Sequence, residues 1–413
     1  MDTEACPAAI VCCTGLLFYR VLAPELLMPD RRSVALLIET SNAYGRGLLD
    51  GIIAYQREHE LWSVYVGEHE RGAPPPDWMK NWRGDGIIAR IETDAIAAVV
   101  RRSRLPTVDV SAARRIPNIP WVETNDREIA ELAARHLIDR GFRKLAYCGE
   151  PLFNWSRWRE ERFLAVCAEE CCDCSVFEGR TPVEEGFSWT RERRRMKSWL
   201  EKLPKPVGVM ACYDFRGQQL LDVCRELDIA VPEQVAVIGV DNDERLCQLC
   251  TPPLSSVIPD SRGAGYRAAQ LLDRIMRGER VPADATLLSP LGIAERQSTD
   301  MYAVDDSDVA TALRYIREHA CEGITVSDVL RVVPLSRRML EHRFQKVLRR
   351  SPHAEIVRIR MERATRLLRE TDLPLSDVAR RAGFASAIYL SKAFKNYTGI
   401  SPRAFRIDGR SVS

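Results

Sequence analysis

Five short apolar runs between residues 33 and 240 constrain the fold of this chain more than any other feature. They read SVALLI (33–38), GIIARI (86–91), KLAYCG (144–149), VGVMAC (207–212) and VAVIGV (235–240). Amphipathic segments of helical length follow them. Strands that are apolar along nearly their whole length are typical of parallel sheets with helices on both faces. Residues 32–297 therefore predict an α/β domain, and the two series of runs predict two lobes with a cleft between them.

The pattern changes close to residue 300. The stretch ERQSTDMYAVDDS (295–307) is polar and without periodicity, and beyond it the apolar spacing is helical, with no strand-like runs. We expect a linker over 298–307 and an all-α domain over 308–408. Residues 1–31 form an extension of uncertain role. Its apolar run at 7–19 lacks the positive residues that precede a signal core and is too short to span a bilayer.

The charge changes sign at the same boundary. The whole chain has a net charge of +2, but residues 307–413 contain 21 Lys and Arg against 11 Asp and Glu. This region therefore carries +10, and the remainder carries −8. A basic domain attached to an acidic one is expected when only that domain binds a polyanion.

Cysteine usage favours a reducing compartment. The chain has 13 cysteines, an odd number, and Cys148, Cys212 and Cys224 lie in apolar segments where a free thiol behaves as a small apolar side chain. We therefore expect a cytoplasmic protein without a disulfide framework. The pair Cys247 and Cys250 has the spacing of half a metal site but no second half, so we expect no metal and no cofactor.

Other function classes find little support. No later run is long enough to cross a membrane, so we expect no membrane partner. The glycine run at 45–51 has the wrong spacing for a dinucleotide-binding loop, and the sequence has neither a nucleophile-elbow motif nor an H-E-x-x-H motif. We therefore do not expect an enzyme.

Two segments of the basic domain have the pattern of a helix-turn-helix unit. In TVSDVLRVVPLSRRMLEHRFQK (325–346), Ser327 is expected to cap a short helix and Ser336 a second one. The second helix would turn four apolar residues inward: Met339, Leu340, Phe344 and Val347. Its other positions are polar and mostly cationic.

The second segment repeats this arrangement at 376–395. Ser376 is expected to cap a short helix, Gly383 to supply the turn and Ser386 to start the second helix. A long helix, roughly 352–369, would join the two units. One such unit is commonly a structural hairpin, but two in tandem with outward Arg and Lys favour DNA binding.

The residues at this point carry a family resemblance. DVARRAGF (377–384) and GFASAIYLSKAFKNYTGISPRAFR (383–406) closely resemble the AraC family of transcription regulators over about 100 residues. Leu390 departs from the family, which usually has Phe there. The resemblance implies that both second helices enter successive major grooves of double-stranded DNA.

The exposed positions of these two helices are the candidates for DNA contacts. Base edges would be contacted by Arg337, Arg338 and Glu341 in the first helix and by Ser386, Ala387, Tyr389 and Lys392 in the second. Arg343, Arg349, Arg350 and Lys395 would contact phosphates or only solvent.

The α/β region carries a second resemblance. NDREIAELAARHLIDRGFRKLAYCG (125–149), VIGVDNDE (237–244) and LSSV (254–257) resemble the periplasmic-binding-protein fold of LacI-type regulators. Those proteins place their DNA-binding unit before the sensor, whereas here it follows. The combination, with ERQSTD (295–300) and HACEGI (319–324), closely resembles the xylose-responsive regulators of bacteria. It implies a monosaccharide effector, with D-xylose as our choice and another monosaccharide as the alternative. It also implies a homodimer, activation of pentose-utilisation genes and RNA polymerase as a further partner. The alternative from another function class is a sugar-processing enzyme.

A sugar site requires carboxylates, amides, cations and an aromatic face, and it is expected where the strands end. Asp241 follows VAVIGV, and the resemblance implies that its carboxylate binds two sugar hydroxyls. Asp214 follows VGVMAC in the same way. Arg162 matches the ligand-binding Arg of the family, with Arg159 as the alternative. The first lobe offers Ser41, Asn42 and Tyr44, then Asn125 and Asp126, whose order is reversed from the family, so that either one can face the ligand. Trp155, Trp158 and Trp189 are alternatives for stacking on the sugar, Trp158 being our choice.

Overall fold

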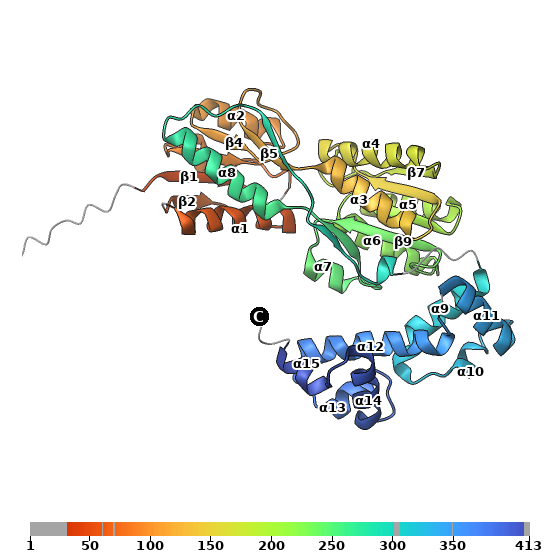
Figure 1. Cartoon of the computed structure of the whole chain (residues 1–413). Coiled ribbons are helices and arrows are strands. Elements are labelled where there is room, and N and C mark those ends of the chain that lie inside the picture. Colours follow the sequence, from red (N-terminus) through yellow and green to blue (C-terminus); the bar gives the residue numbers. More distant parts are fainter. Residues whose placement is uncertain (1–30, 60, 69–70, 301–305, 349, 409–413) are drawn as a thin grey trace, which may run out of the picture.

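The computed structural model describes residues 31–59, 61–68, 71–300, 306–348 and 350–408. It has two α/β lobes and a separate helical domain that lies against the second lobe (Figure 1). The predicted fold class, a two-lobed sensor-like region followed by an all-α domain, is confirmed.

Lobe 1 is a parallel six-stranded sheet covered by helices. Its strands follow the order β11-β5-β4-β3-β1-β2. Its elements are β1 (Ser33–Leu37), α1 (Ala43–Glu58), β2 (Ser63–Val66), η1 (Asp77–Asn81), β3 (Gly86–Ala89), α2 (Asp94–Ser103), β4 (Thr107–Asp109), β5 (Trp121–Thr124), α8 (Ser261–Met276) and β11 (Ala285–Leu288).

Lobe 2 is a second six-stranded sheet, of order β12-β10-β9-β8-β6-β7, in which β12 alone pairs antiparallel. Its elements are α3 (Asp126–Asp139), β6 (Lys144–Gly149), α4 (Asn154–Glu169), β7 (Asp173–Glu178), α5 (Trp189–Lys202), β8 (Val207–Ala211), α6 (Asp214–Glu226), β9 (Val235–Val240), α7 (Glu244–Leu249), β10 (Ser255–Ile258), β12 (Gly292–Ala294) and η2 (Gln297–Thr299).

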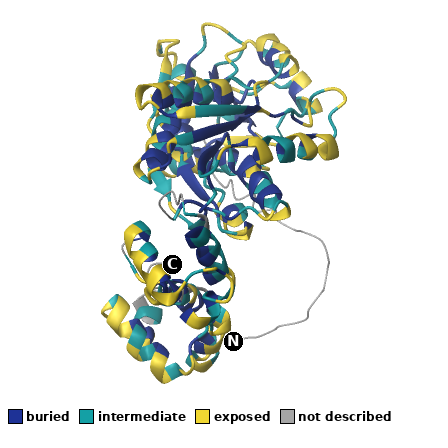
Figure 2. Ribbon diagram, turned by 90° about the vertical axis from the view of Figure 1, so that its right-hand side faces the viewer, coloured by how far each residue is buried: buried dark blue, intermediate teal, exposed yellow. Residues whose placement is uncertain are grey.

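The chain passes between the lobes after β5, after β10 and after β11. The sheets form the buried centre of the lobes (Figure 2), and β3, β8 and β9 are buried along their whole length. These are three of the five apolar runs. Because parallel strands all end at one edge of a sheet, the ends of the strands in both lobes can face a common cleft.

The glycine run after β1 serves helix packing. A Cβ on Gly51 would lie 2.0 Å from the carbonyl oxygen of Arg262, and one on Gly265 would lie 2.0 Å from that of Leu48. The backbones of α1 and α8 therefore approach too closely for any side chain at these positions.

The helical domain contains α9 (Ser307–His319), η3 (Ala320–Glu322), α10 (Val326–Val329), α11 (Arg337–Leu348), α12 (Pro352–Glu370), α13 (Leu375–Arg381), α14 (Ala387–Thr398) and α15 (Pro402–Asp408). Two apolar cores, one for each helix-turn-helix unit, are joined by α12. The long helix predicted at 352–369 is therefore present. No helix in the described part of the chain has the length and apolar character needed to cross a bilayer.

The ends of the short helices differ from our prediction. Thr325, not Ser327, caps α10, and it forms a reciprocal capping box with Asp328. Ser376 lies inside α13, whose N-cap is Pro374. Ser386 does cap α14, by accepting a hydrogen bond from the backbone N–H of Tyr389.

The burial of individual residues corrects the predicted core of the first helix-turn-helix unit and the predicted start of the linker. Met339 is 45% exposed and does not belong to the core, whereas Leu340 and Phe344 are fully buried. Ser298 and Thr299, within the range expected for the linker, are fully buried in lobe 2. The Ser298 hydroxyl donates to the carbonyl oxygen of Val237 in β9, so that the sensor region extends to this point.

Candidate functional site

A small cavity lies between the two lobes, where their strands end. Lobe 1 contributes Tyr44, Arg71, Arg90 and Glu123, and lobe 2 contributes Trp155, Arg159, Tyr213 and Asp241. Arg90 directly follows β3 and Asp241 directly follows β9, so the strand ends position both side chains. The lobes are close together here, since Arg46 of α1 pairs with Asp243 beyond β9 at 2.8 Å.

On the lobe 1 side, a fully enclosed cation is surrounded by carboxylates. Arg90 lies 3.2 Å from Glu39 and 2.8 Å from Glu92, and its guanidinium is 5.0 Å from the ring centre of Tyr44. The Tyr44 hydroxyl donates to Glu123. Burial raises the pKa of Glu123 well above its ordinary value, although Arg90 opposes the shift. This wall of the cavity therefore offers both a hydrogen-bond donor and an acceptor.

On the lobe 2 side, Arg159 of α4 donates to Asp126 over 2.7 Å, and both side chains are buried. Burial raises the pKa of Asp126 to about 6, and the neighbouring Arg159 acts in the opposite direction. Trp155 lies near two cations, with its ring centre 5.1 Å from the Arg159 guanidinium and 5.0 Å from that of Arg71. Arg71 thus reaches from lobe 1 to the aromatic wall of lobe 2.

Several buried polar atoms around this cavity have no hydrogen-bond partner in the described residues. Three of them, Arg71 Nε, Glu123 Oε2 and Trp155 Nε1, belong to residues that line the cavity. The fourth, Asp126 Oδ2, belongs to the partner of Arg159 and lines a neighbouring recess. Buried polar atoms are nearly always paired with protein, water or ligand. Two donors and one acceptor on the residues that line one space, with a second acceptor on the bonded partner of Arg159, are the complement of a small molecule with several hydroxyl groups, each of which both donates and accepts.

The backbone that carries Asp241 is strained. Asp241 has φ +101° and Asn242 has φ +47°, both in the left-handed region that non-glycine residues rarely adopt. Asp214 supports this loop, because its carboxylate accepts from the N–H of Asp243 at 2.7 Å and from the Ser256 hydroxyl at 2.6 Å. Asp214 is therefore placed behind the cavity, where burial raises its pKa to about 8.

The structure brings together only part of the residues expected from the sequence. Tyr44, Arg159 and Asp241 line the cavity, and Asp126 is bonded to Arg159. Arg162 lies on the outside of α4, paired with Glu131 at 2.8 Å and Glu169 at 2.7 Å. Of the two alternatives, Arg159 is therefore the one that reaches the cavity.

The other expected residues have different surroundings. Asn42 caps α1, and Ser41 beside it is exposed. Asn125 caps α3, which leaves Asp126 as the member of that pair directed toward Arg159. Trp158 lines a neighbouring recess and makes an edge contact with Trp121, while Trp189 is exposed at the start of α5. Among the three tryptophans, Trp155 is the one that lines the cavity.

Four lining residues are absent from the sequence-based set: Arg71, Arg90, Glu123 and Tyr213. Arg90 and Glu123 belong to apolar or mixed strand segments, GIIARI and WVET, in which a charged residue is unusual. A charged residue at the end of a buried strand is therefore the sequence signal that could have identified Arg90 and Glu123 as site residues. Arg71 lies in an irregular loop, for which the sequence provides no comparable pattern.

The second candidate site is the outer surface of α11 and α14. Arg337, Arg338 and Glu341 are exposed on α11, where Arg337 pairs with Glu341 at 3.1 Å. On α14, Ser386, Tyr389, Lys392 and Lys395 are exposed, and Ala387 is half-buried. Leu340 and Leu390 fix the opposite faces in the two cores. Both helices thus expose their N-terminal turns, as second helices of DNA-reading units do.

The residues of the first unit that were predicted to contact phosphates are largely paired with carboxylates instead. Arg343 is half-buried and pairs with Asp306 and Asp308, each at 3.1 Å. Arg350 pairs with Glu355 at 3.0 Å. Arg349 lies outside the described residues. The exposed side chain of Lys395 makes no ion pair or hydrogen bond in the described part of the chain, and it remains a candidate for phosphate.

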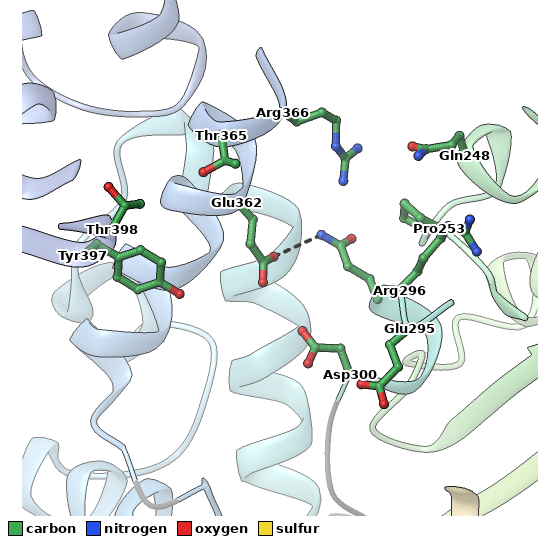
Figure 3. Close-up of a pocket in the computed structure, with 11 residues that line it drawn as sticks. Gln248, Pro253, Glu295, Arg296, Asp300, Glu362, Thr365, Arg366, Tyr397 and Thr398 are labelled. Carbon is green, nitrogen blue, oxygen red and sulfur yellow. Dashed lines mark hydrogen bonds between the residues drawn. The ribbon is translucent and has the colours of Figure 1, made fainter. Parts of the chain in front are cut away.

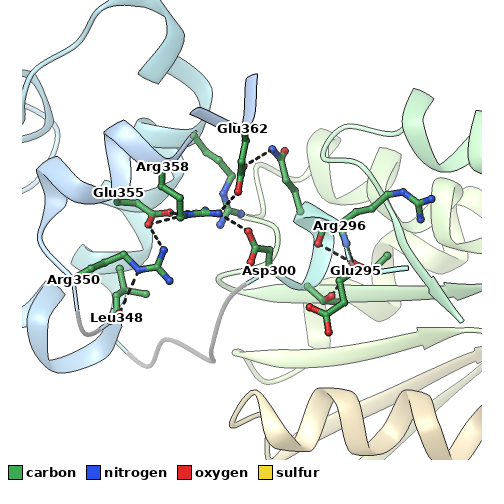
Figure 4. Close-up of polar contacts among 12 residues, drawn as sticks. Glu295, Arg296, Asp300, Leu348, Arg350, Glu355, Arg358 and Glu362 are labelled. Carbon is green, nitrogen blue, oxygen red and sulfur yellow. Dashed lines mark hydrogen bonds and ion pairs between the residues drawn. The ribbon is translucent and has the colours of Figure 1, made fainter. Parts of the chain in front are cut away.

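Polar contacts connect the helical domain to lobe 2. Arg317 of α9 is 3.2 Å from the buried Glu233, and Arg314 is 2.7 Å from Asp228. Figure 4 shows a second group, in which Arg358 of α12 contacts Glu355, Glu362 and Asp300, the last at 2.7 Å.

A larger hollow, of about 620 Å³, lies at this junction (Figure 3), between Gln248, Pro253 and Arg296 of lobe 2 and Glu362, Arg366 and Tyr397 of the helical domain. Within the described residues, none of its lining side chains has a buried polar atom without a partner. The cavity between the lobes is therefore the candidate small-molecule site.

Comparison with known proteins agrees with this architecture. The chain is 34% identical over 388 residues to the xylose operon regulatory protein of Escherichia coli (strain K12). The matched region covers 92% of this chain and 98% of that relative. The corresponding protein of Haemophilus influenzae is 30% identical over 91% of this chain and 98% of its own length. The chain belongs to the family of xylose operon regulatory proteins.

Family models and solved structures support this membership. Residues 33–127 match the XylR N-terminal domain, 134–299 a periplasmic binding protein-like domain and 329–407 a helix-turn-helix domain. The solved structure of the xylose-binding transcription activator XylR has a TM-score of 0.80 and 32% identity, and it covers 92% of this chain and 98% of its own. A LacI-type regulator from Alkaliphilus metalliredigens, 18% identical with a TM-score of 0.53, shares the fold of the sensor.

For a xylose operon regulator, the two sites have distinct roles. The chain is a sugar-responsive, AraC-type transcription regulator, and its relatives are regulators rather than enzymes. The two lobes form its sensor and the helical domain its DNA-binding part.

Proposed function

We propose that D-xylose binds in the cavity between the lobes and that the chain then activates pentose-utilisation genes as a cytoplasmic homodimer, together with RNA polymerase. The main support is the set of unpartnered buried polar atoms on residues that line this cavity, Arg71 Nε, Glu123 Oε2 and Trp155 Nε1, together with Asp126 Oδ2 on the bonded partner of Arg159. The xylose-binding activator that shares the fold over the whole chain adds support for the sugar and for activation.

In the proposed complex the carboxylates of Asp241, Asp126 and Glu123 accept from sugar hydroxyls, and Arg159 and Arg71 donate to them. Hydrogen bonds to charged groups contribute more than neutral ones, and they discriminate between epimers because the site is built for particular hydroxyl directions. The face of Trp155 packs against the C–H surface of the ring.

Sugar binding in the cleft changes the DNA-reading domain only if the sugar prefers one arrangement of the molecule. The proposal is that the closed lobes, joined by Arg46 and Asp243, hold the junction with α9 and α12 in the DNA-competent arrangement. In a homodimer the four helix-turn-helix units then meet neighbouring half-sites, and units on one DNA face are spaced by about 34 Å.

Titration calorimetry with D-xylose, L-arabinose, D-ribose and D-glucose tests the proposal. We expect D-xylose to bind most tightly and Asp241→Asn to lose at least tenfold in affinity. Reporter transcription in the presence of each sugar tests activation. Tighter binding of another monosaccharide would mean that the same architecture senses that sugar instead of D-xylose. Binding of none of them would contradict the assignment of the two lobes as a sugar sensor.

A further inference from the structure

The two DNA-reading helices differ in the chemistry that they expose. The units superpose in sequence with an offset of fifty residues. Ser336 and Ser386 both cap their helix by accepting a hydrogen bond from a backbone N–H, Leu340 and Leu390 are fully buried, and so are Phe344 and Phe394. Equivalent positions of the two helices can therefore be compared directly. The first turn of α11 exposes Arg337 and Arg338, whereas that of α14 has Ala387 and Ile388.

Ile388 has an unusual environment for an aliphatic residue. It is 84% exposed, more than any other large apolar side chain in the described part of the chain. The neighbouring Tyr389 leans on Phe384 of the preceding turn, with ring centres 6.1 Å apart, and does not cover Ile388. Lys392 follows one helical turn later, exposed and without an ion pair among the described residues.

Position and chemistry together indicate what covers Ile388. The N-terminal turn of the second helix is the part of a helix-turn-helix unit that contacts base edges. In the major groove the only apolar group that a base pair presents is the methyl of thymine, and apolar side chains recognise it. A β-branched side chain on a helix is held in few rotamers, so that its methyl groups keep a fixed direction.

We propose that Ile388 is a specificity-determining residue that packs against a thymine methyl in the half-site read by α14, whereas Arg338, its counterpart on α11, reads guanine. The two halves of each binding site thus differ in composition, and the order of the two units on DNA is fixed by this difference. The inference rests on the proposed sequence-specific DNA binding.

The test begins with selection of DNA sites from a random pool by the full-length chain with D-xylose. In the best selected duplex each thymine is then replaced, one at a time, by deoxyuridine, which lacks only the methyl group. We expect one or two replacements in one half-site to weaken binding by about three- to fivefold, the effect of one buried methyl. In Ile388→Ala the same replacements should have no effect.

Matched variants separate this role from general damage. Ile388→Val, which keeps a branched apolar side chain, should retain discrimination against deoxyuridine. Arg338→Ala should respond to thymine replacements as the native chain does, but should become insensitive to 7-deazaguanine, which lacks the N7 acceptor. Because Ile388 is exposed, its replacement should leave the unfolding temperature unchanged.

The outcomes are distinct. Failure of the selection to enrich any sequence would refute the proposed sequence-specific binding. Enrichment of a site at which native and Ile388→Ala chains respond equally to every deoxyuridine would refute only the role of Ile388. An Ile388→Ala chain with native thymine discrimination but reduced transcription would also refute it, and would place a protein partner on this side chain.

Discussion

The cavity between the lobes is costly for the free protein at the scale of single residues. The lining residue Arg159 and its partner Asp126 are both buried, and one carboxylate oxygen of Asp126 and one of the lining residue Glu123 have no hydrogen-bond partner among the described residues. An unsatisfied buried polar atom costs about 1–3 kcal/mol. A ligand that supplies the missing partners recovers this cost in addition to its own contacts, so the same atoms that reduce the stability of the free sensor increase its affinity for a sugar.

The two arginines of α4 give the sharpest test of the site. We expect Arg159→Ala to reduce D-xylose affinity by at least tenfold, because it removes a donor and leaves Asp126 buried without its partner. Arg162→Ala should leave the affinity unchanged, since Arg162 pairs with Glu131 and Glu169 outside the cavity. Titration calorimetry of both variants checks this, and equal losses would contradict the assignment.

The raised pKa of Asp126 predicts a pH dependence. In the folded chain this pKa is about 6, against 3.8 as the ordinary value. The group therefore penalises folding as the pH rises through that interval. Above pH 6 the carboxylate is ionised and pairs with Arg159; below it, the ion pair is lost. We expect D-xylose affinity to fall as the pH is lowered, by about tenfold one unit below the pKa.

Calorimetry between pH 5 and pH 8 measures this effect. The variant Asp126→Asn should bind more weakly at neutral pH and show little change over the same range. A native pH profile in the variant would assign the titration to another group, for example Glu123.

At the scale of elements, the sequence predicts what periodicity and apolar runs can encode. The five apolar runs coincide with β1, β3, β6, β8 and β9, and α12 is found where a helix was predicted. The short strand β4 and the exposed edge strand β2 have no such pattern, because one is too brief and the other has no buried face. Tertiary pairing alone makes them strands.

The candidate site was predictable only in part, for a related reason. Tyr44 and Asp241 follow strong strand patterns, and the two arginines of α4 follow the run KLAYCG at helical distance. Which arginine faces inward depends on the rotation of α4, and its hydrophobic pattern is too weak to fix that rotation. Arg71 comes from a loop, and only the three-dimensional structure brings it to the cavity.

The close approach of the backbones of α1 and α8 predicts the effect of replacing a glycine between these two elements. A Cβ at position 51 would overlap the backbone of α8, so Gly51→Ala should destabilise the sensor by about 1–3 kcal/mol despite the better helix propensity of Ala. Gly67→Ala, where a Cβ has no neighbour within 4 Å, serves as the control and should change stability little. Urea unfolding of the full chain with tryptophan fluorescence measures both.

At the scale of the whole molecule, the sensor and the DNA-reading domain are connected by charged contacts rather than by an apolar interface. Glu233 is buried and Arg317 is half-buried, yet neither carboxylate oxygen of Glu233 makes a hydrogen bond in the described residues. Buried ion pairs of poor geometry contribute little net stability. Such a junction can rearrange at low cost when the sensor changes its conformation.

The contact between Asp300 and Arg358 should therefore carry part of the sugar response. We expect Asp300→Ala to retain sugar affinity and DNA affinity in the absence of sugar, but to reduce the change in DNA affinity that D-xylose causes. Fluorescence anisotropy with the selected duplex measures the ratio of the DNA affinity with sugar to the DNA affinity without sugar. By linkage, the effect of DNA on sugar affinity should shrink by the same factor.

Arg331→Ala provides the matched control, because Arg331 pairs with Asp328 within the DNA-reading domain at 2.9 Å. This variant should keep the full response. An unchanged ratio in Asp300→Ala would exclude the α12 contact as a route between the sites.

The position of the reading domain after the sensor also matters while the protein is being made. Domains generally fold as units during synthesis, the earlier one first, at about 5–20 residues per second. Both sensor sheets are complete in sequence by β12, so about 100 residues, and therefore about 5–20 seconds, separate the end of the sensor from the end of α14. Each newly made copy can thus sample the sugar in its surroundings before it is able to read DNA.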